Sequence, residues 1–432
     1  MTHVIRLVVV AHDGATLDGS DATPLRVVTP AAPGAAAISF VPDSVDGIGP
    51  AFGVGATILV ERGRVRVTSF DRPGGDVIDQ AILDAGTTPG RVELIADAPA
   101  GLVLLSNAAD DGASRVTVLA LERIDAPATD HWPASLSEPQ VAPGWSHYYA
   151  TLGNTLAEKA RLRRHLRSTE PFAVTWADGL QFHIAPSDQL SRVVYVSGTY
   201  EPHTLRLLRS WLAPGAVFVD AGANAGVVSI AAARWVGPSG RVISLEPSAR
   251  EFARLVDHVG LNGLSQVTPI RAAVTDASGW QTLRVAADPC GGLNTLGDAF
   301  AYPGLLMAGV EDVATTSLDA LVADQALIKV DVIKLDVEGS EAAALRGGAA
   351  TLATHRPVVV VEVCAASLTA SGSSVHAVDS LLRAAGYVCF EIDDATGALQ
   401  ATAGLSDTTD RNVVAMPVER ADALLAAAGG SS

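Results

Sequence analysis

A glycine-spaced turn that follows an aspartate is the stretch of this sequence best suited to binding a ligand. It reads VFVDAGANAG from Val217 to Gly226 and carries Asp220, Gly222 and Asn224 at alternate positions. An apolar strand before the turn and a small-residue run after it predict strand, turn and helix. That order brings backbone N–H groups and a helix N-terminus beside a ligand. The glycines remove Cβ atoms that would block close approach.

A carboxylate further along the chain completes a cofactor pattern. The stretch GPSGRVISLEPS predicts a turn and a second strand that ends in Glu246. At this place in a βαβ unit an acidic side chain can accept hydrogen bonds from both hydroxyls of a ribose. Ser248 and Glu251 follow as S-x-x-E, which predicts a capping box for the next helix.

A second group of ionisable residues lies in the stretch KLDVEGSE, from Lys334 to Glu341. Asp336 ends a strand predicted to lie beside the first one. Its carboxylate is therefore expected at the carboxyl edge of the sheet, where open α/β folds bind ligands. Capping of the following helix accounts for one of the two glutamates. It does not account for Lys334 and Asp336 on a strand that is otherwise apolar.

The elements that must position these residues change in kind along the chain. Segments rich in Val, Ile and Leu, separated by Gly, Pro, Asp and Asn clusters, predict a mainly β N-terminal domain. From about residue 170, strands alternate with helices, which predicts a doubly wound α/β sheet with an antiparallel last strand. A hairpin-like insertion is expected around GWQTLRVAA and VATTSLDAL. The expected organisation is a β-rich accessory or interaction domain at 1–125, a linker and helical segment at 126–169, the α/β domain at 170–420 and a flexible tail at 421–432.

Composition narrows the classes of partner. The 432 residues are 48% apolar and carry a formal charge of −17, which argues against nucleic acid or an anionic membrane as the main partner. No run of about 18 apolar residues predicts a membrane span. The three cysteines, Cys290, Cys364 and Cys389, have neither a disulfide framework nor ligand spacing. A cytoplasmic protein without a bound metal is therefore expected.

Several segments together resemble the FkbM-type methyltransferases. These are GTYEP (198–202), VFVDAGANAG, ISLEP (243–247), GGLNTLG (291–297), TTSLDAL and IKLDVEGSEAAALRGG. The resemblance covers about residues 170–418. It implies a class I methyltransferase Rossmann-like fold and S-adenosyl-L-methionine as the cofactor. Carried over by position, it implies cofactor contacts at Glu201 (amino group), Asp220, Gly222, Asn224 and Gly226 (methionine side), Glu246 and Pro247 (ribose), Ala273 (adenine) and Asp336 (sulfonium end).

The reaction that the resemblance implies is O-methylation of a small acceptor, a natural product such as a polyketide or a sugar or glycolipid. The activated methyl group needs alignment more than acid–base help, but a hydroxyl must still lose its proton to a group within hydrogen-bond reach. Asp336 and Glu338 are the predicted catalytic residues, with Glu362 and the less suitable His203 as further candidates for the base.

Three other functions stay open at this stage. An NAD(P)-dependent oxidoreductase would share the strand, glycine turn and distal acidic residue, although Asn224 stands in place of the second fingerprint glycine. An N-methyltransferase and a non-catalytic binding protein are the others. The N-terminal domain is expected either to hold the acceptor or to mediate self-association, and neither the acceptor's identity nor the oligomeric state follows from the sequence.

Overall fold

The computed structural model describes residues 168–421, apart from 288, 289, 303 and 408. It also describes residues 158, 161 and 165 and the backbone of ten strands between residues 7 and 125. By its internal contacts the chain forms two compact units, whose longest segments are residues 1–131 and 169–432. The predicted linker and helical segment at 126–169 and the predicted tail at 421–432 lie almost wholly outside the described residues. The predicted domain boundaries therefore stay predictions.

The strands of the first unit form two five-stranded sheets with antiparallel pairing, in the orders β1-β4-β9-β6-β7 and β2-β3-β10-β5-β8. Their bounds are β1 (Leu7–Ala11), β2 (Thr16–Asp18), β3 (Leu25–Val28), β4 (Ala36–Pro42), β5 (Ala51–Arg62), β6 (Arg64–Phe70), β7 (Val77–Asp84), β8 (Gly90–Asp97), β9 (Leu102–Asn107) and β10 (Arg115–Asp125). That this unit is an accessory or interaction domain stays a prediction.

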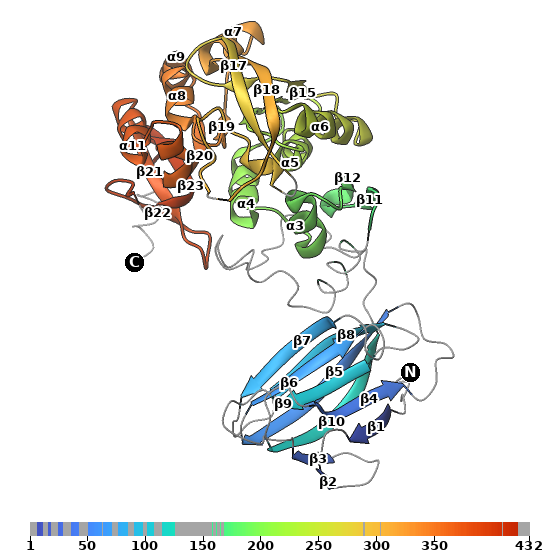
Figure 1. Cartoon of the computed structure of the whole chain (residues 1–432). Coiled ribbons are helices and arrows are strands. Elements are labelled where there is room, and N and C mark those ends of the chain that lie inside the picture. Colours follow the sequence, from blue (N-terminus) through green and yellow to red (C-terminus); the bar gives the residue numbers. More distant parts are fainter. Residues whose placement is uncertain are drawn as a thin grey trace. The chain divides into compact units, whose positions relative to one another are not determined.

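The second unit is built on an eight-stranded sheet with helices on both faces (Figure 1). Its strand order is β15-β14-β13-β19-β20-β23-β21-β22. The first five strands are parallel, and β23 runs antiparallel to both of its neighbours. The predicted doubly wound class I sheet and its antiparallel last long strand are confirmed. The bounds are β13 (Val217–Ala221), β14 (Arg241–Leu245), β15 (Val267–Ile270), β19 (Val332–Leu335), β20 (Val358–Cys364), β21 (Tyr387–Ile392), β22 (Leu399–Ala401) and β23 (Asp410–Pro417).

Two hydrophobic cores sandwich this sheet because successive strand residues point to opposite faces. On β13, Phe218 belongs to the core shared with α3, α4 and α5, whereas Val217 and Val219 belong to the core shared with α7, α8, α9 and α11. All five residues of β13 are buried, as expected for a central parallel strand. The helices are α3 (Gln189–Ser197), α4 (Pro202–Trp211), α5 (Val227–Val236), α6 (Ala249–Leu261), α7 (Leu318–Asp324), α8 (Glu341–Arg346), α9 (Ala349–His355), α10 (Ala365–Ala370) and α11 (Val375–Ala384).

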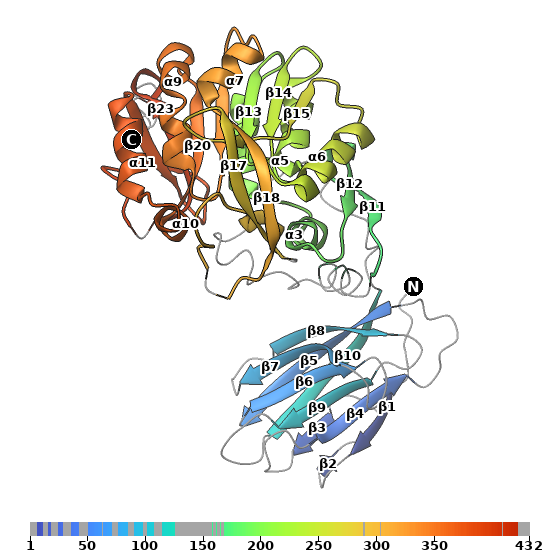
Figure 2. The same ribbon diagram turned by 45° about the horizontal axis from the view of Figure 1, so that its top comes forward.

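Two smaller sheets flank the large one. The hairpin β11 (Phe172–Thr175) and β12 (Gln181–Ile184) encloses the short 3-10 helix η1 (Ala177–Gly179). The expected insertion is a three-stranded sheet of β16 (Ala273–Val274), β18 (Met307–Thr316) and β17 (Gly279–Ala286). Figure 2 shows its β17–β18 hairpin in front of the large sheet. The chain between these two strands contains the short helix η2 (Gly291–Leu293) and returns towards the carboxyl edge of the sheet.

The predicted capping box of α6 is wrong. Ser248 is the N-cap residue, but its side chain accepts no helix N–H and instead donates to the carboxylate of Glu251. That carboxylate is buried and also accepts hydrogen bonds from Arg250 and Asn294. Because Glu251 is engaged there, it does not return to the Ser248 N–H, which donates to Glu246 at 2.9 Å instead.

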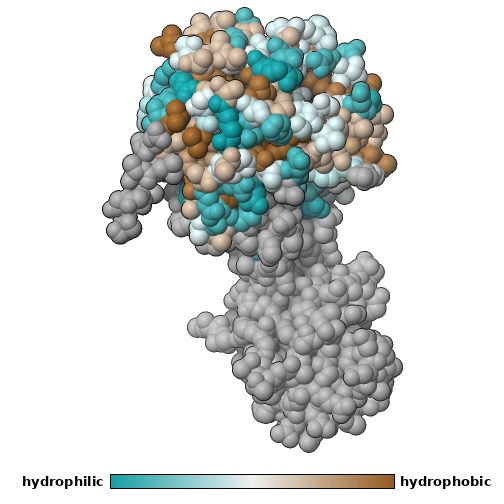
Figure 3. Space-filling model, turned by 90° about the vertical axis from the view of Figure 1, so that its left-hand side faces the viewer, coloured by the Kyte–Doolittle hydropathy of each residue, from teal (hydrophilic) through white to brown (hydrophobic). Residues whose placement is uncertain are grey.

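The surface of the second unit mixes residue types. On the face shown in Figure 3, hydrophilic and hydrophobic residues are interspersed. Among the helices of the described residues, none combines the length and the apolar character that a membrane span requires.

Candidate active site

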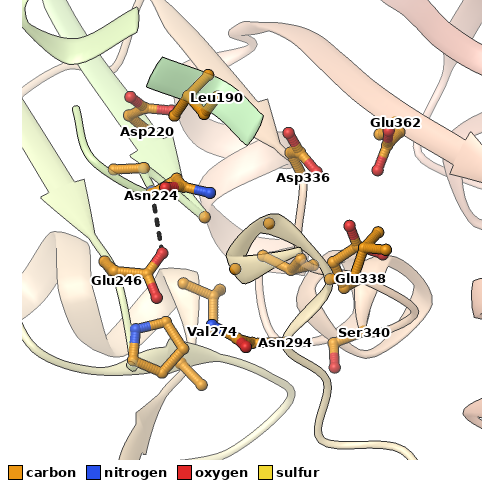
Figure 4. Close-up of a pocket in the computed structure, with 18 of the residues that line it drawn as sticks. Leu190, Asp220, Asn224, Glu246, Val274, Asn294, Asp336, Glu338, Ser340 and Glu362 are labelled. Carbon is orange, nitrogen blue, oxygen red and sulfur yellow. Dashed lines mark hydrogen bonds between the residues drawn. The ribbon is translucent and has the colours of Figure 1, made fainter. Parts of the chain in front are cut away.

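A cavity of about 320 Å³ lies at the carboxyl ends of the central parallel strands. Each of four strands delivers one carboxyl group to its wall, Asp220 from β13, Glu246 after β14, Asp336 after β19 and Glu362 near the end of β20. Figure 4 shows Asp220, Asn224 and Glu246 on one side, and Asp336, Glu338 and Glu362 on the other. The cavity thus has two halves, and parallel strands bring together residues that are far apart in the sequence.

Three residues between β13 and α5 have positive φ, of which Gly226 is the N-cap of α5 and the other two shape the turn itself. Gly222 has φ 83° and Asn224 has φ 49°, a region that glycine adopts freely and asparagine tolerates. A Cβ at Gly222 would overlap the backbone carbonyl oxygen of Asp336. The N–H groups of Gly222 and Ala223 both donate to the Leu245 carbonyl at 2.9 Å. The turn is therefore fixed against β14 and against the residue that follows β19.

Glu246 lies beside this turn, and each of its carboxylate oxygens already accepts one hydrogen bond. One oxygen accepts from the N–H of Asn224 and the other from the N–H of Ser248, each at 2.9 Å. Each oxygen keeps a further lone pair for a ligand hydroxyl. Burial raises the pKa of Glu246 to about 8, against the opposing effect of these two backbone hydrogen bonds. Hydroxyl donors from a ligand would favour the ionised form.

Asp220 carries an oxygen without a partner. Its side chain is fully buried, and one oxygen accepts from the Ser229 hydroxyl at 2.5 Å, whereas the other has no hydrogen-bond partner. Burial raises the pKa of this carboxyl group, although the charge of Lys334 and the Ser229 bond lower it. A buried acceptor left without a donor is costly.

Three carboxyl groups meet on the other half of the wall. Oxygen atoms of Asp336, Glu338 and Glu362 all lie within 4.8 Å of one another. Lys334 is buried beside them, with its Nζ 2.6 Å from Asp336 and 4.0 Å from Glu201. Burial would lower the pKa of Lys334, but the carboxylates of Asp336, Glu201 and Asp220 outweigh it and raise the pKa, so the lysine is charged.

These carboxyl groups differ in protonation. Burial alone would raise the pKa of Asp336, but the charge of Lys334, together with hydrogen bonds involving Glu362 and Lys334, brings the pKa below its ordinary value. Burial, and after it the negative charge of Asp336, raises the pKa of both Glu338 and Glu362 well above the ordinary value. The shifts run in opposite directions, so Asp336 ionises more readily than Glu338 and Glu362 beside it.

Most of the predicted site residues line the cavity, and two do not. Asp220, Gly222, Asn224, Glu246, Pro247, Ala273, Asp336 and Glu338 are on the wall. Gly226 is the N-cap of α5 with φ 86°, and its Cα packs against Leu255. Glu201 lies behind the wall, where it accepts a hydrogen bond from Asn412 at 2.7 Å, and its neighbour Tyr200 lines the cavity instead. Cofactor contacts by Gly226 and Glu201 stay predictions.

The sequence reasoning gave no role to several residues of the wall. In the sequence, Lys334 is a charged residue on an otherwise apolar strand, which indicates a special position but no particular role. Asn294 lies in the GGLNTLG segment and closes one end of the cavity. It accepts from the Ala286 N–H at 2.9 Å and donates to Glu251 at 3.2 Å. Tyr302 and Leu190 come from segments without any motif. Only the first two had a signal in the sequence.

The pH dependence of stability tests the buried glutamates. Glu246 and Glu341 have pKa values of about 8 and about 7, raised by burial from 4.5. A raised pKa in the folded state stabilises the fold below the unfolded pKa, and this contribution is lost as pH rises through the folded value. We expect the melting temperature of the unliganded protein to fall between about pH 5 and 8.

Differential scanning calorimetry across this range measures the slope. A Glu246→Gln variant cannot ionise at that position and is expected to show a smaller fall. Equal slopes in the variant and the wild type would contradict the assignment of the slope to Glu246.

The residues present fit a nucleoside cofactor with an amino-acid end. Each Glu246 oxygen keeps a lone pair that a diol could use, and Asp220 and Gly222 lie on the same wall. The cofactor contacts that the resemblance implies at these three positions stay predictions.

Comparison with known proteins assigns the domain. Residues 220–389 match the model of the Methyltransferase FkbM domain. No match was found among curated proteins. The solved structures that resemble the chain include a methyltransferase FkbM from Methylobacillus flagellatus KT, with 12% identity, a TM-score of 0.30, and 62% of this chain and 60% of that chain covered. The chain thus spans less than two thirds of that protein.

Two further structures are O-methyltransferases by description. One, from Bacillus cereus in complex with SAH, has 13% identity and a TM-score of 0.31, with 51% of this chain and 82% of that chain covered. The other, from Streptomyces achromogenes in complex with SAM, has 11% identity and a TM-score of 0.29, with 51% and 81% covered. These likenesses are weak, and the domain match carries the assignment. Residues 220–389 match the methyltransferase FkbM domain, and the cofactor that this match implies is S-adenosylmethionine.

Proposed function

We propose that this chain methylates a hydroxyl group of a small acceptor, a natural product such as a polyketide or a sugar or glycolipid. The observation that carries this proposal is the cluster of three carboxyl groups on the cavity wall. Oxygen atoms of Asp336, Glu338 and Glu362 lie within 4.8 Å of one another there. A hydroxyl acceptor needs such a group because it must lose a proton when its oxygen is alkylated.

When bound, S-adenosylmethionine supplies a methyl group that is already activated on a sulfonium sulfur. The residues of the chain then have two tasks. Asp220, the glycine turn and Glu246 hold and orient the cofactor. Asp336 accepts the acceptor's proton or orients the reacting groups, and the raised pKa of Glu338 and Glu362 favours the protonated form, which can donate hydrogen bonds to acceptor oxygens.

The two enzyme alternatives make weaker use of these residues. A neutral amine is a stronger nucleophile than a neutral hydroxyl and has less need of a carboxylate base, so an N-methyltransferase makes less use of the three carboxyl groups. An oxidoreductase would not require Asp336 and Glu338 at the reacting end. The hydroxyl acceptor accounts for all three groups, and we therefore prefer it.

A turnover screen tests the proposal. The full chain is incubated with S-adenosylmethionine labelled in its methyl group and with polyketides, sugars and glycolipids that carry a free hydroxyl. We expect label to appear in an acceptor and to disappear when the hydroxyl is blocked as a methyl ether. A chelator is expected to leave turnover unchanged, because an activated methyl donor needs no Lewis acid.

Three results would contradict the proposal. Label on the nitrogen of amine acceptors alone would favour N-methylation. Fluorescence from bound reduced nicotinamide, without binding of S-adenosylhomocysteine, would favour an oxidoreductase. Loss of turnover with chelator and its recovery with a divalent ion would refute the metal-free reaction.

A further inference from the structure

Glu338 is held on the cavity wall in a backbone conformation that its residue type disfavours. Its φ of 47° lies in the left-handed region, where a residue other than glycine persists only when its surroundings fix it. The next residue, Gly339, has φ 102°, and a Cβ there would overlap the Ser371 hydroxyl. The turn that presents Glu338 to the cavity is therefore a strained and closely packed segment.

The carboxylate of Glu341 accepts hydrogen bonds from the backbone of this turn. It accepts a hydrogen bond from the Val337 N–H at 3.1 Å and two from the Gly339 N–H at 3.2 and 3.1 Å. These amides directly flank Glu338. The Glu341 residue is 2% exposed, so water cannot replace its carboxylate as the acceptor for these amides.

This role goes beyond ordinary helix capping. Glu341 is the first residue of α8, where an acidic side chain is expected to favour the N–H groups of its own helix. Its carboxylate does accept from the Glu341 N–H, and it also turns back to two amides that precede the helix. The side of the turn towards the cavity is held separately, since the Thr295 hydroxyl donates to the Glu338 carbonyl at 2.8 Å and the Ser367 hydroxyl donates to its carboxyl group at 3.1 Å.

We infer that Glu341 is a positioning residue for Glu338, because its carboxylate fixes the two amides that keep Glu338 turned into the cavity. The inference rests on the proposed function for the part that concerns turnover. The part that concerns geometry stands independently, because it depends only on which acceptor holds the Val337 and Gly339 amides.

The test compares two glutamate variants with a matched control elsewhere in the domain. Glu341→Gln keeps the shape but presents an NH2 group to one of the amides, and Glu341→Asp is too short to reach both. The control is Asp319→Asn. Asp319 holds the amides of Ala350 and Thr351 at 3.1 and 2.7 Å in the same way but is absent from the cavity wall.

Two quantities are measured on the full chain. Hydrogen–deuterium exchange is followed in a peptide that spans residues 335–343, and kcat is measured with labelled S-adenosylmethionine and the acceptor from the screen above. We expect both Glu341 variants to exchange faster in that peptide and to lose about 10- to 100-fold in kcat, with a smaller change in KM. Asp319→Asn should exchange faster only around residue 350 and keep the wild-type kcat.

Each other outcome is informative. Unchanged exchange in both Glu341 variants would overturn the inference, because the carboxylate would not be holding the amides. Faster exchange with wild-type kcat would also overturn it, since the turn would then be irrelevant to Glu338. If Glu341→Gln does not fold, Glu341→Asp decides. If the wild type methylates no acceptor, the proposed function fails, and the exchange measurement still decides what holds the turn.

Discussion

Replacing Glu246 with alanine is expected to weaken the binding of S-adenosylhomocysteine by about 30- to 1,000-fold, or roughly 2–4 kcal/mol. The wild-type affinity is expected in the micromolar range. The reason is the loss of two charge-assisted hydrogen bonds from the ribose hydroxyls to a carboxylate on the cavity wall. Titration calorimetry measures the affinity directly and needs no acceptor.

The alanine variant also removes the acceptor for the Asn224 and Ser248 amides, so part of the loss could come from a displaced turn. Glu246→Gln keeps the side-chain volume and one acceptor oxygen, and we expect its loss to be intermediate. Glu391→Ala, on strand β21 in an exposed pair with Arg411, is the matched control and should bind like the wild type. Wild-type affinity in Glu246→Ala would refute the assignment of Glu246.

Replacing Asp336 with asparagine is expected to lower turnover about 100-fold or more if Asp336 takes the acceptor's proton. Asparagine preserves the shape and cannot act as a base. A role confined to orienting the cofactor would leave substantial activity. The rate of label transfer under saturating cofactor therefore separates the two roles.

The buried Lys334 complicates this variant, because asparagine removes its nearest carboxylate and leaves Glu201, at 4.0 Å, and Asp220 to stabilise its charge. An unpaired buried charge destabilises a fold. The double variant Lys334→Met/Asp336→Asn removes both charges, so its melting temperature shows whether the single variant fails through folding. Asp276→Asn, in an exposed pair with Arg346, serves as the surface control. Unchanged turnover in both Asp336→Asn and Asp336→Ala would remove the residue from the site.

The fold and half of the site could be predicted because they depend on local patterns. The alternation of strands and helices, the turn VFVDAGANAG and the carboxylates that follow two of the later strands, Glu246 and Asp336, are all visible in short windows. Parallel strands align their carboxyl ends, so Asp220, Glu246 and Asp336 had to meet at one edge. Their meeting follows from topology and needed no knowledge of side-chain packing.

The remaining features depend on side chains that pack across long sequence separations. Glu251 has the spacing of a capping residue, yet it is buried against Asn294. Glu341 has the position of a helix-start residue, yet it faces backwards to Gly339. The same residue type at the same helical position can serve either role, and only the tertiary environment decides. Sequence spacing alone could not assign these two residues.

The absence of a side chain at Gly222 has a consequence for how this site can diverge. The backbone of Gly222 packs directly against the carbonyl of Asp336, so the separation between the cofactor turn and the catalytic strand is set by main chain alone. Substitutions among the side chains around the acceptor can alter what is accepted without changing that separation. The lining of the cavity is therefore open to variation in this scaffold, whereas the spacing between Gly222 and Asp336 is not.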